Sequence, residues 1–289
     1  EENNMRKVKK IFVPLEEGAN IAGIAESCLD IATLFPHSVL IKPKAIPESQ
    51  PNLKNIGTIL EVSNDLAKCV EKEIEKGNAT LVIGGDHAVA LGSISGVANH
   101  FANLGLIWID AHGDMNTHET TETGNIHGMI LASLQGFGEK RLKSILNPST
   151  KILKNNIVIF GVRDLDIREK QLMDEEGIKY ISFSSIKNKG FRKSLETAKE
   201  SLSQCEYLHI SFDLDSCDPD NVPGVSVPVK GGFQQDDIFA ILNFLFNAFK
   251  VVSADIVEYN MLFDEKDMTR SFLLKLIDYF TISLSKTNL

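Results

Sequence analysis

The sequence lacks the features of disulfide-rich, membrane-spanning and nucleic-acid-binding proteins. Its 289 residues include only 4 cysteines, none in a CxxC pair, which argues against a disulfide framework or a thiolate zinc cluster and favours buried free thiols. No apolar run reaches the length of a membrane span. Positive charge is not in excess either, since the net charge is −9 and the pI about 5.3. We therefore expect no nucleic-acid partner and no membrane partner.

The N-terminus also lacks the apolar core and cleavage site of a signal peptide, which predicts a cytoplasmic location. We interpret Met5 as the native start and residues 1–4 as a remnant of recombinant expression or a short leader. No internal repeat, low-complexity tract or linker interrupts the remaining sequence. Residues 5–289 are therefore predicted to form a single domain.

Short apolar runs alternate with amphipathic segments along the whole chain, which predicts a three-layer α/β/α fold with a mostly parallel, roughly eight-stranded sheet. Several of the runs are continuously apolar, as in strands that are buried on both faces. The expected strands are residues 10–13, 39–41, 80–83, 106–109, 157–160, 179–181, 207–212 and 251–256. The expected helices are a segment around 62–74 that stops at Gly77, and residues 88–101, 167–176, 191–202, 236–249 and 269–284. The three prolines of residues 42–55 predict a loop.

Residues 105–129, GLIWIDAHGDMNTHETTETGNIHGM, combine one of these strands with a group of metal-ligand residues. Asp110, His112 and Asp114 follow the strand at intervals of two, so on an extended backbone their side chains project to one side. A buried strand end would not hold two aspartates and a histidine at this spacing unless a cation offset their repulsion and desolvation. We interpret the triplet as part of a metal site.

Two further strands end in similar residues. Residues 80–83 run into the sequence GGDH, which includes His87, and residues 207–212 run into Asp213 and Asp215. Sites in open α/β sheets form beyond the carboxyl ends of the strands, so these side chains are expected at one edge. The set of four aspartates and two histidines is too large for one ion with an open position and suits a pair of Mn²⁺ or similar ions.

The segments GGDH, DAHGDMN with GNIHG, and SFDLDSCDPDNVPG resemble the three metal motifs of the ureohydrolase (arginase/agmatinase) family. The GNIHG segment and the VRDLD segment at residues 162–166 are most similar to the arginase branch. The resemblance extends from about Thr80 to Glu258. It implies the arginase-like fold and a hydrolase of linear amidines.

The resemblance also implies two Mn²⁺ ions per chain and the roles of the site residues. One ion would be held by His87, Asp110, Asp114 and Asp213, and the other by Asp110, His112, Asp213 and Asp215, with Asp110 and Asp213 bridging. The implied catalytic residues are Asp114, His127, which would shuttle a proton, and Glu258, which would anchor the guanidinium. The implied ligands of the substrate's α-carboxylate and α-amino group are Asn116, Thr123, Asn125 and Asp166.

The implied reaction is hydrolysis of L-arginine to L-ornithine and urea by a metal-bridging hydroxide. The alternatives within the family are agmatinase, guanidinobutyrase and formiminoglutamase activities. Outside it, a catalytically silent homologue that binds metal and a deacetylase-like enzyme stay open. Val227 stands where arginases usually have a threonine, and this change bears on the substrate. The resemblance further implies a homo-oligomer, a trimer or a hexamer.

Two residues outside these motifs also have an expected role. Asp255, three residues before Glu258, is expected to orient a metal ligand. His209 belongs to no motif and is interpreted as structural.

Overall fold

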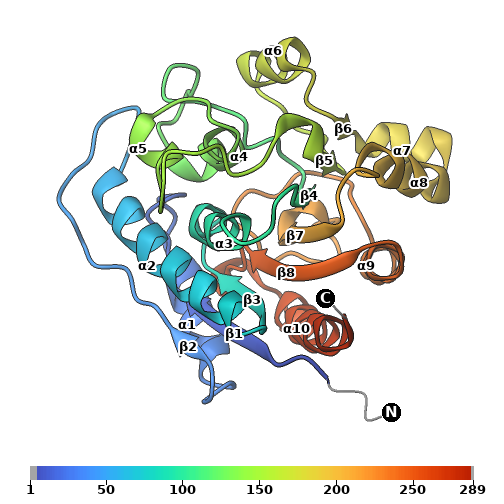
Figure 1. Ribbon diagram of the computed structural model, residues 1–289, viewed down its shortest axis with the longest axis horizontal. Helices are drawn as coiled ribbons and strands as arrows, with labels where there is room; N and C mark the ends of the chain where they lie inside the picture. Colours follow the sequence, from blue (N-terminus) through green and yellow to red (C-terminus); the bar gives the residue numbers. More distant parts are fainter. Residues whose placement is uncertain (1–4, 288–289) are drawn as a thin grey trace.

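Eight parallel strands form one sheet through the middle of the molecule (Figure 1). The computed structural model describes residues 5–287, so the interpretation of residues 1–4 concerns a segment outside the described residues. The strands are β1 (Val8–Val13), β2 (Val39–Leu40), β3 (Ala79–Gly84), β4 (Gly105–Ile109), β5 (Ile157–Phe160), β6 (Tyr180–Ile181), β7 (Tyr207–Asp213) and β8 (Lys250–Val257).

Helices cover both faces of the sheet. One face carries α2 (Ile56–Glu75), α3 (Val89–Ala98), α4 (Ile130–Leu134), α5 (Lys140–Lys143) and α6 (Ile167–Glu176). The other carries α1 (Ile24–Ala32), α7 (Phe183–Lys189), α8 (Phe191–Ser201), α9 (Gln235–Ala248) and α10 (Met268–Lys286). Short 3-10 turns are η1 (Ile126–Met129), η2 (Lys154–Asn156), η3 (Leu214–Ser216) and η4 (Met261–Phe263). None of the helices within residues 5–287 is long and apolar enough to cross a lipid bilayer.

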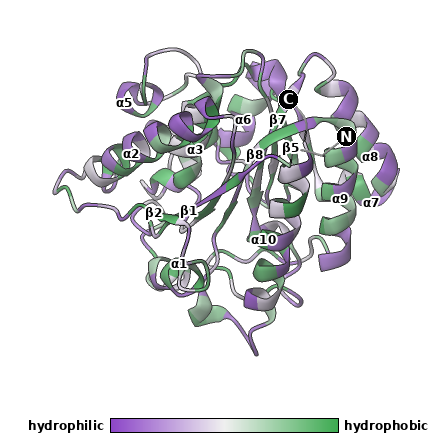
Figure 2. Ribbon diagram, turned by 60° about the horizontal axis from the view of Figure 1, so that its bottom comes forward, coloured by the Kyte–Doolittle hydropathy of each residue, from purple (hydrophilic) through white to green (hydrophobic). Residues whose placement is uncertain are grey.

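The two helical layers enclose two separate hydrophobic cores because alternate residues of each strand point to opposite faces. In β1, Ile11 and Val13 pack with α2 and α3, whereas Phe12 packs on the opposite side. In β4, Trp108 faces the first core and its neighbour Ile109 the second. Hydrophobic residues accordingly lie along the central strands (Figure 2). The three-layer α/β/α prediction is confirmed.

All eight predicted strands are present, with ends that differ by at most two residues. The sheet is wholly parallel rather than mostly so. The six predicted helices are also present, although α2 begins six residues before the periodicity at Val62. Helices α1, α4, α5 and α7, which have only 4 to 9 residues each, were not predicted. Helices this short contain too few turns for a clear 3.6-residue period.

The strand order β2-β1-β3-β8-β7-β4-β5-β6 determines where a site can form. The last two strands of the chain, β7 and β8, lie between β3 and β4, so the connections that leave β3 and β4 diverge. This divergence opens a crevice beyond the carboxyl ends of the four central strands.

The turn after β3 depends on a close approach between two backbones. Gly85 N donates a hydrogen bond to Val13 O at 2.8 Å, and Asp86 N donates one to Leu15 O at 2.8 Å. A Cβ atom at residue 85 would lie 1.8 Å from Leu15 O. Only glycine fits at residue 85. This close packing positions the backbone of the segment that leads to His87.

We therefore predict that Gly85→Ala lowers the free energy of unfolding by about 1–3 kcal/mol, because the clash is with backbone and cannot be relieved by a side-chain rotation. Gly128→Ala is the matched control, since a Cβ there meets nothing within 4 Å. Thermal or urea denaturation of both variants checks the prediction. Equal stability of the two would contradict it.

Candidate metal centre

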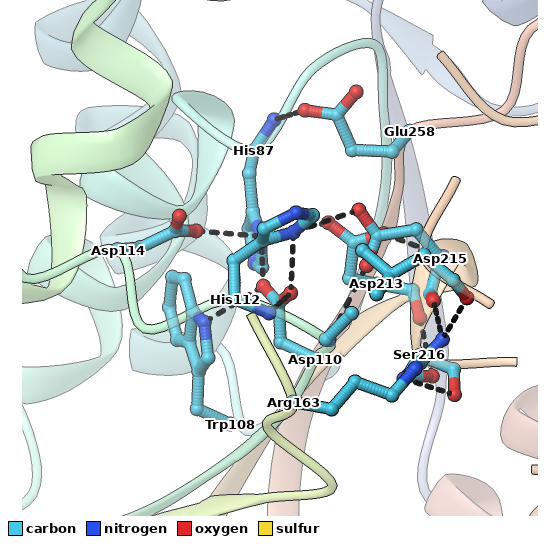
Figure 3. A network of polar contacts seen from close by, with 12 residues as sticks. His87, Trp108, Asp110, His112, Asp114, Arg163, Asp213, Asp215, Ser216 and Glu258 are labelled. Atoms are coloured by element: carbon cyan, nitrogen blue, oxygen red, sulfur yellow. Dashed lines mark hydrogen bonds and ion pairs between the residues drawn. The ribbon is translucent and has the colours of Figure 1, made fainter. Parts of the chain in front are cut away.

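The six predicted metal ligands converge beyond the carboxyl ends of β3, β4 and β7 (Figure 3). They are His87 after β3, Asp110, His112 and Asp114 after β4, Asp213 at the end of β7, and Asp215 within η3. All except His112 are buried. The topology thus places four aspartates and two histidines, which are separated by up to 128 residues in sequence, around one point.

His87 lies at the centre of one half of this cluster. Its Nδ1 atom is 3.1 Å from a carboxylate oxygen of each of Asp110, Asp114 and Asp213. This Nδ1 atom nevertheless forms no hydrogen bond with any of residues 5–287. The nitrogen therefore points between the three oxygens rather than at one of them. Adjacent donors around an octahedral ion with bonds of about 2.1 Å lie about 3 Å apart. The arrangement therefore fits a divalent cation.

His112 forms the second half of the cluster. Its Nδ1 atom lies 3.3 Å from Asp110 Oδ1 and 3.1 Å from Asp215 Oδ2. Asp110 thus turns one oxygen toward His112 and the other toward His87. Two groups with metal-ligand spacing result, His87 with Asp110 and Asp213, and His112 with Asp110 and Asp215. Asp110 belongs to both, which is the geometry that a bridging ligand needs.

Asp213 differs from Asp110 in this respect. Its Oδ2 atom lies 3.1 Å from His87 Nδ1. Among the described residues, however, the carboxylate oxygens within 4.0 Å of a His112 nitrogen belong to Asp110 and Asp215 and not to Asp213. The bridging role of Asp213 stays a prediction.

Electrostatics also favours a cation at this point. Burial raises the pKa of Asp213 well above its usual range, and the carboxylates of Asp215 and Asp110 raise it further. Burial likewise raises the pKa of Asp215 to about 6, against the favourable charge of His112. Carboxylates in this environment ionise at neutral pH when positive charge is supplied. Bound divalent ions would supply it.

A buried polar network supports His87 from behind. His87 Nε2 lies 2.8 Å from Ser211 Oγ, which donates to Asp255 Oδ1 at 2.5 Å. Asp255 Oδ2 in turn contacts His209 Nε2 at 2.8 Å. Asp255 therefore reaches the predicted ligand through a serine, and His209 is joined to the same network. A hydrogen bond of this kind fixes the tautomer and orientation of a ligating imidazole.

Trp108 completes the support of the buried ligands. Its ring stacks on the His87 imidazole with centroids 3.9 Å apart, and its Nε1 atom donates to Asp110 Oδ2 at 3.0 Å. Trp108, Ser211 and His209 were not predicted from the sequence as parts of the site. Their spacing was the available signal, because residues two or four apart on a strand share a face. Trp108 lies two residues before Asp110, and Ser211 and His209 lie two and four residues before Asp213.

Buried Glu258 and half-buried His127 form a second pair above the cluster. Glu258 Oε1 lies 3.0 Å from His127 Nδ1 and accepts a hydrogen bond of 2.9 Å from His87 N. Glu258 Oε2 is buried and has no hydrogen-bond partner among residues 5–287. Burial lowers the pKa of His127, but Glu258 outweighs burial and raises it to about 9. The pair therefore offers a protonated imidazole and one free carboxylate oxygen.

The predicted substrate ligands line a cavity of about 270 Å³ over the cluster. Asn116 Nδ2 donates to Asp166 Oδ2 at 2.8 Å, which joins the polar loop after β4 to the N-terminus of α6. Thr123 Oγ1 accepts a hydrogen bond of 3.1 Å from Asn125 N. The structure therefore brings all four residues to one cavity together with His127 and Glu258.

Five further lining residues were not predicted from the sequence as parts of the site. They are Ile21, Thr121, Gly128, Asp164 and Glu169. Glu169 is buried and accepts hydrogen bonds from Met115 N at 2.8 Å and Asp166 N at 3.2 Å. Its position three residues after Asp166 matches a capping box, which was a usable signal. Ile21 lies in a loop before α1, and no sequence pattern marked it as a site residue.

Arg163 is another supporting residue that sequence reasoning missed. Its guanidinium donates to the carbonyl oxygens of Asp215, Ser216 and Cys217 at 2.8–3.1 Å. It also reaches Val229 O at 2.9 Å. It thereby fixes the turn that carries Asp215 (Figure 3).

With this geometry established, comparison with known proteins decides the family. The model of the arginase family matches residues 33–282, which is most of the chain. The chain belongs to the arginase family. The family resemblance inferred from the three motifs is thereby confirmed.

Individual arginases are similar over most of their length. The arginase of Bacillus subtilis (strain 168) is 39% identical over 231 residues, which cover 80% of this chain and 78% of that protein. The crystal structure of arginase from Bacillus cereus superposes with a TM-score of 0.88 at 35% identity, covering 98% of this chain and 100% of that one. The crystal structure of Entamoeba histolytica arginase in complex with L-ornithine superposes with a TM-score of 0.82 at 30% identity. The match covers 97% of this chain and 99% of that one. The arginase-like fold is confirmed.

The His127–Glu258 pair of this arginase-family chain predicts a pH-dependent stability. The folded-state pKa of His127, about 9, is raised above its ordinary value, so the stabilisation is fully present below about pH 6.5 and is lost as the pH rises through 9. The pKa of Glu258 is lowered despite burial, mainly by His127, so its contribution is lost only in acid. The free energy of unfolding of wild type should exceed that of His127→Asn by about 2–3 kcal/mol near pH 6. At pH 9.5 the difference should be much smaller.

Unfolding free energies of both proteins across this pH range, at constant divalent-metal concentration, check the prediction. His118→Asn is the control, because His118 lies 4.0 Å from Glu119, which is exposed. A difference between wild type and His127→Asn that does not change with pH would contradict the prediction.

Proposed function

We propose that this member of the arginase family is a hydrolase that converts L-arginine and water to L-ornithine and urea. The observation that carries the proposal is the position of an unpartnered, buried carboxylate oxygen, Glu258 Oε2, above five residues with metal-ligand spacing among the described residues. Asp114 lies beside these five, 3.1 Å from His87 Nδ1. Such a pocket suits a cationic group that is to be attacked by water. The similarity to the arginases of Bacillus subtilis and Bacillus cereus supports the same reaction.

The donor set fits two Mn²⁺ ions. His87, Asp110, Asp114 and Asp213 would hold one ion, and Asp110, His112, Asp213 and Asp215 the other. Carboxylate oxygens with imidazole nitrogens, and no thiolate, suit Mn²⁺ better than a structural zinc. When bound, such ions lower the pKa of water and so provide a nucleophile at neutral pH.

Glu258 is proposed to bind and orient the guanidinium. Its Oε1 atom is fixed by His127 and by the backbone of His87, so the free Oε2 atom has a defined position. The left-handed backbone of Glu258, with φ 71°, is uncommon for a non-glycine residue and indicates that the fold imposes this orientation. An N–H of the guanidinium would donate to Oε2.

His127 is proposed to transfer the proton that bond cleavage requires. Water adds to the guanidinium carbon, Cζ of arginine, and the bond between Cζ and Nε then breaks. Nε leaves as the δ-amino group of ornithine, and this amine must gain a proton. The raised pKa of His127, about 9, keeps its imidazole protonated at neutral pH. General acid catalysis of this kind contributes about 10²–10⁴-fold.

Asn116, Thr123, Asn125 and Asp166 are proposed to bind the amino-acid end of the substrate. The carboxylate of Asp166 would attract the α-ammonium, and the amides and hydroxyl would donate to the α-carboxylate. L-Ornithine, the ligand in the Entamoeba histolytica arginase complex, carries the same α-ammonium and α-carboxylate groups.

The alternative substrates differ from L-arginine at one end or the other. Agmatine and guanidinobutyrate each lack one of the two α-substituents, and formiminoglutamate lacks the guanidinium. Val227 lines the cavity, and its side chain cannot form a hydrogen bond, so the polar lining residues must provide the specificity at the two ends. No aromatic residue lines this cavity within the described chain, which favours an amino-acid substrate over the acyl-lysine of a deacetylase.

Metal stoichiometry tests the assignment of the ligands. Asp114 lies near His87 only, whereas Asp110 faces both histidines. We predict that Asp114→Asn reduces the bound metal from two ions toward one, while Asp110→Asn weakens both. Metal analysis after dialysis provides the ratio. Two ions and full activity in Asp114→Asn would refute the assignment.

Urea release from a panel of guanidino compounds tests the reaction itself. We predict that kcat/KM for L-arginine exceeds that for agmatine by about 10²–10⁴, because agmatine leaves several donors unpaired. Equal or better use of agmatine would refute the arginine assignment, and metal binding without turnover would identify a silent homologue. A cytoplasmic location and a trimeric or hexameric assembly remain part of this proposal.

A further inference from the structure

Two aliphatic side chains, Ile21 and Val227, line the otherwise polar cavity over the metal cluster. Within residues 5–287 they are the only lining residues with an aliphatic side chain, and each is partly buried. Ile21 comes from the loop before α1, whereas Val227 comes from the segment between η3 and α9. The proposed reaction uses neither side chain. We call this pair the aliphatic wall.

Asn260 joins the two segments that carry the aliphatic wall. It is fully buried, and its Nδ2 atom donates hydrogen bonds of 3.0 Å to Ala22 O and of 3.0 Å to Ser226 Oγ. One nitrogen thus contacts the residue after Ile21 and the residue before Val227. The two acceptor oxygens are at most about 6 Å apart, twice the length of these bonds. The two segments therefore lie side by side at the cavity.

The same asparagine is tied to the proposed guanidinium anchor. Asn260 lies two residues after Glu258, and its N atom donates a hydrogen bond of 2.9 Å to Gly224 O. Val225 forms an antiparallel bridge with Tyr259. The segment that leads to Val227 therefore runs along the segment that carries the anchor. These contacts fix the aliphatic wall relative to the carboxylate of Glu258.

A substrate with two polar ends and an aliphatic middle fits this arrangement. In L-arginine, three methylene groups separate Nε from the α-carbon. Each methylene that leaves water for an apolar surface improves binding by roughly fourfold, and a carboxylate provides no such surface. The aliphatic wall therefore provides the apolar surface that the middle of the substrate requires.

We propose that Ile21 and Val227 determine the length of the aliphatic spacer that the enzyme accepts, and that Asn260 positions them. This inference rests on the proposed function and narrows its substrate class to amino acids whose spacer has the length of that in L-arginine. Such a substrate places its methylenes against the aliphatic wall while Glu258 binds its guanidinium. A longer or shorter spacer loses either the wall contact or the anchor.

The first test compares kcat/KM of the Mn²⁺-loaded protein for L-arginine and for L-homoarginine, which has one more methylene. We expect Ile21→Ala and Val227→Ala to lower kcat/KM for L-arginine by about 5–50-fold, mainly through KM, because the methylenes lose an apolar surface. The space gained admits the longer spacer, so the ratio of L-arginine to L-homoarginine should fall by at least about fivefold. Val227→Thr keeps the branched shape and should keep the wild-type ratio.

Asn260→Asp tests the positioning role. The aspartate can still accept the hydrogen bond of 3.0 Å from Leu262 N, but the donor to Ala22 O and Ser226 Oγ is lost. We expect the same fall in the ratio of L-arginine to L-homoarginine. Ser226→Ala removes only one of the two contacts and should shift the ratio less, in the same direction. This milder variant keeps the test valid if Asn260→Asp does not fold.

Asn156→Asp is the matched control. Asn156 is also buried, donates from Nδ2 to Leu104 O at 3.4 Å and accepts a hydrogen bond of 3.0 Å from Gln204 Nε2. It lies just before β5, at the end of the sheet opposite the cavity. A loss of packing or stability alone lowers the activity toward both substrates equally. The ratio in Asn156→Asp should therefore equal that of wild type.

Equilibrium binding of L-ornithine and L-lysine provides a second measurement that does not depend on turnover. These products have the spacer lengths of L-arginine and L-homoarginine. Ile21→Ala and Val227→Ala should lose affinity for L-ornithine and reduce its advantage over L-lysine. Equal losses for both ligands and both substrates would overturn the role of the aliphatic wall.

The remaining outcomes separate the parts of the inference. A changed ratio in Ile21→Ala and Val227→Ala, with a wild-type ratio in Asn260→Asp and Ser226→Ala, would overturn the positioning role of Asn260. If wild type hydrolyses L-arginine and all these variants keep its ratio, only this inference fails. If wild type neither hydrolyses L-arginine nor binds L-ornithine, the proposed function fails, and this inference with it.

Discussion

Mutual repulsion among buried carboxylates is the constraint around which this structure is arranged. The parallel sheet directs the ends of its four central strands to one crevice, and those ends carry Asp110, Asp213 and Glu258 with their neighbours. Burial alone would protonate several of them, as the raised pKa values of Asp213 and Asp215 indicate. Bound cations would therefore complete the site. The proposed divalent metal ions and a guanidinium above them would supply this positive charge.

Within residues 5–287, these repelling groups are held in place by backbone contacts rather than by salt bridges to lysine or arginine. His112 N donates to Asp110 Oδ1, Asp215 N to Asp213 Oδ1, and His87 N to Glu258 Oε1. Asp114 and Glu258 both adopt left-handed backbone conformations, with φ of 50° and 71°. Strain of this kind is retained where the surrounding structure enforces it. The tight packing at Gly85 and the network from Ser211 to His209 provide that enforcement.

The sequence predicted the sheet and the cluster because both depend on local patterns. Short apolar runs, several of them continuous, marked the eight strands, and ligand residues at two-residue spacing marked the strand ends of the site. It did not predict the strand order, since the insertion of β7 and β8 between β3 and β4 depends on contacts far apart in sequence. For the same reason it missed Ile21, which reaches the cavity from a loop without a motif. It also missed α1, which is too short for a clear period. Trp108 and Ser211 were within reach, because each shares a strand face with a predicted ligand.

The central claim is that the aspartate and histidine cluster binds two divalent ions that share Asp110. Anomalous diffraction from crystals grown with Mn²⁺ and measured on both sides of the manganese absorption edge tests it most directly. The account predicts two peaks a few ångströms apart, one beside His87 Nδ1 and one beside His112 Nδ1, with Asp110 between them. A single peak, or peaks away from both histidines, would contradict it.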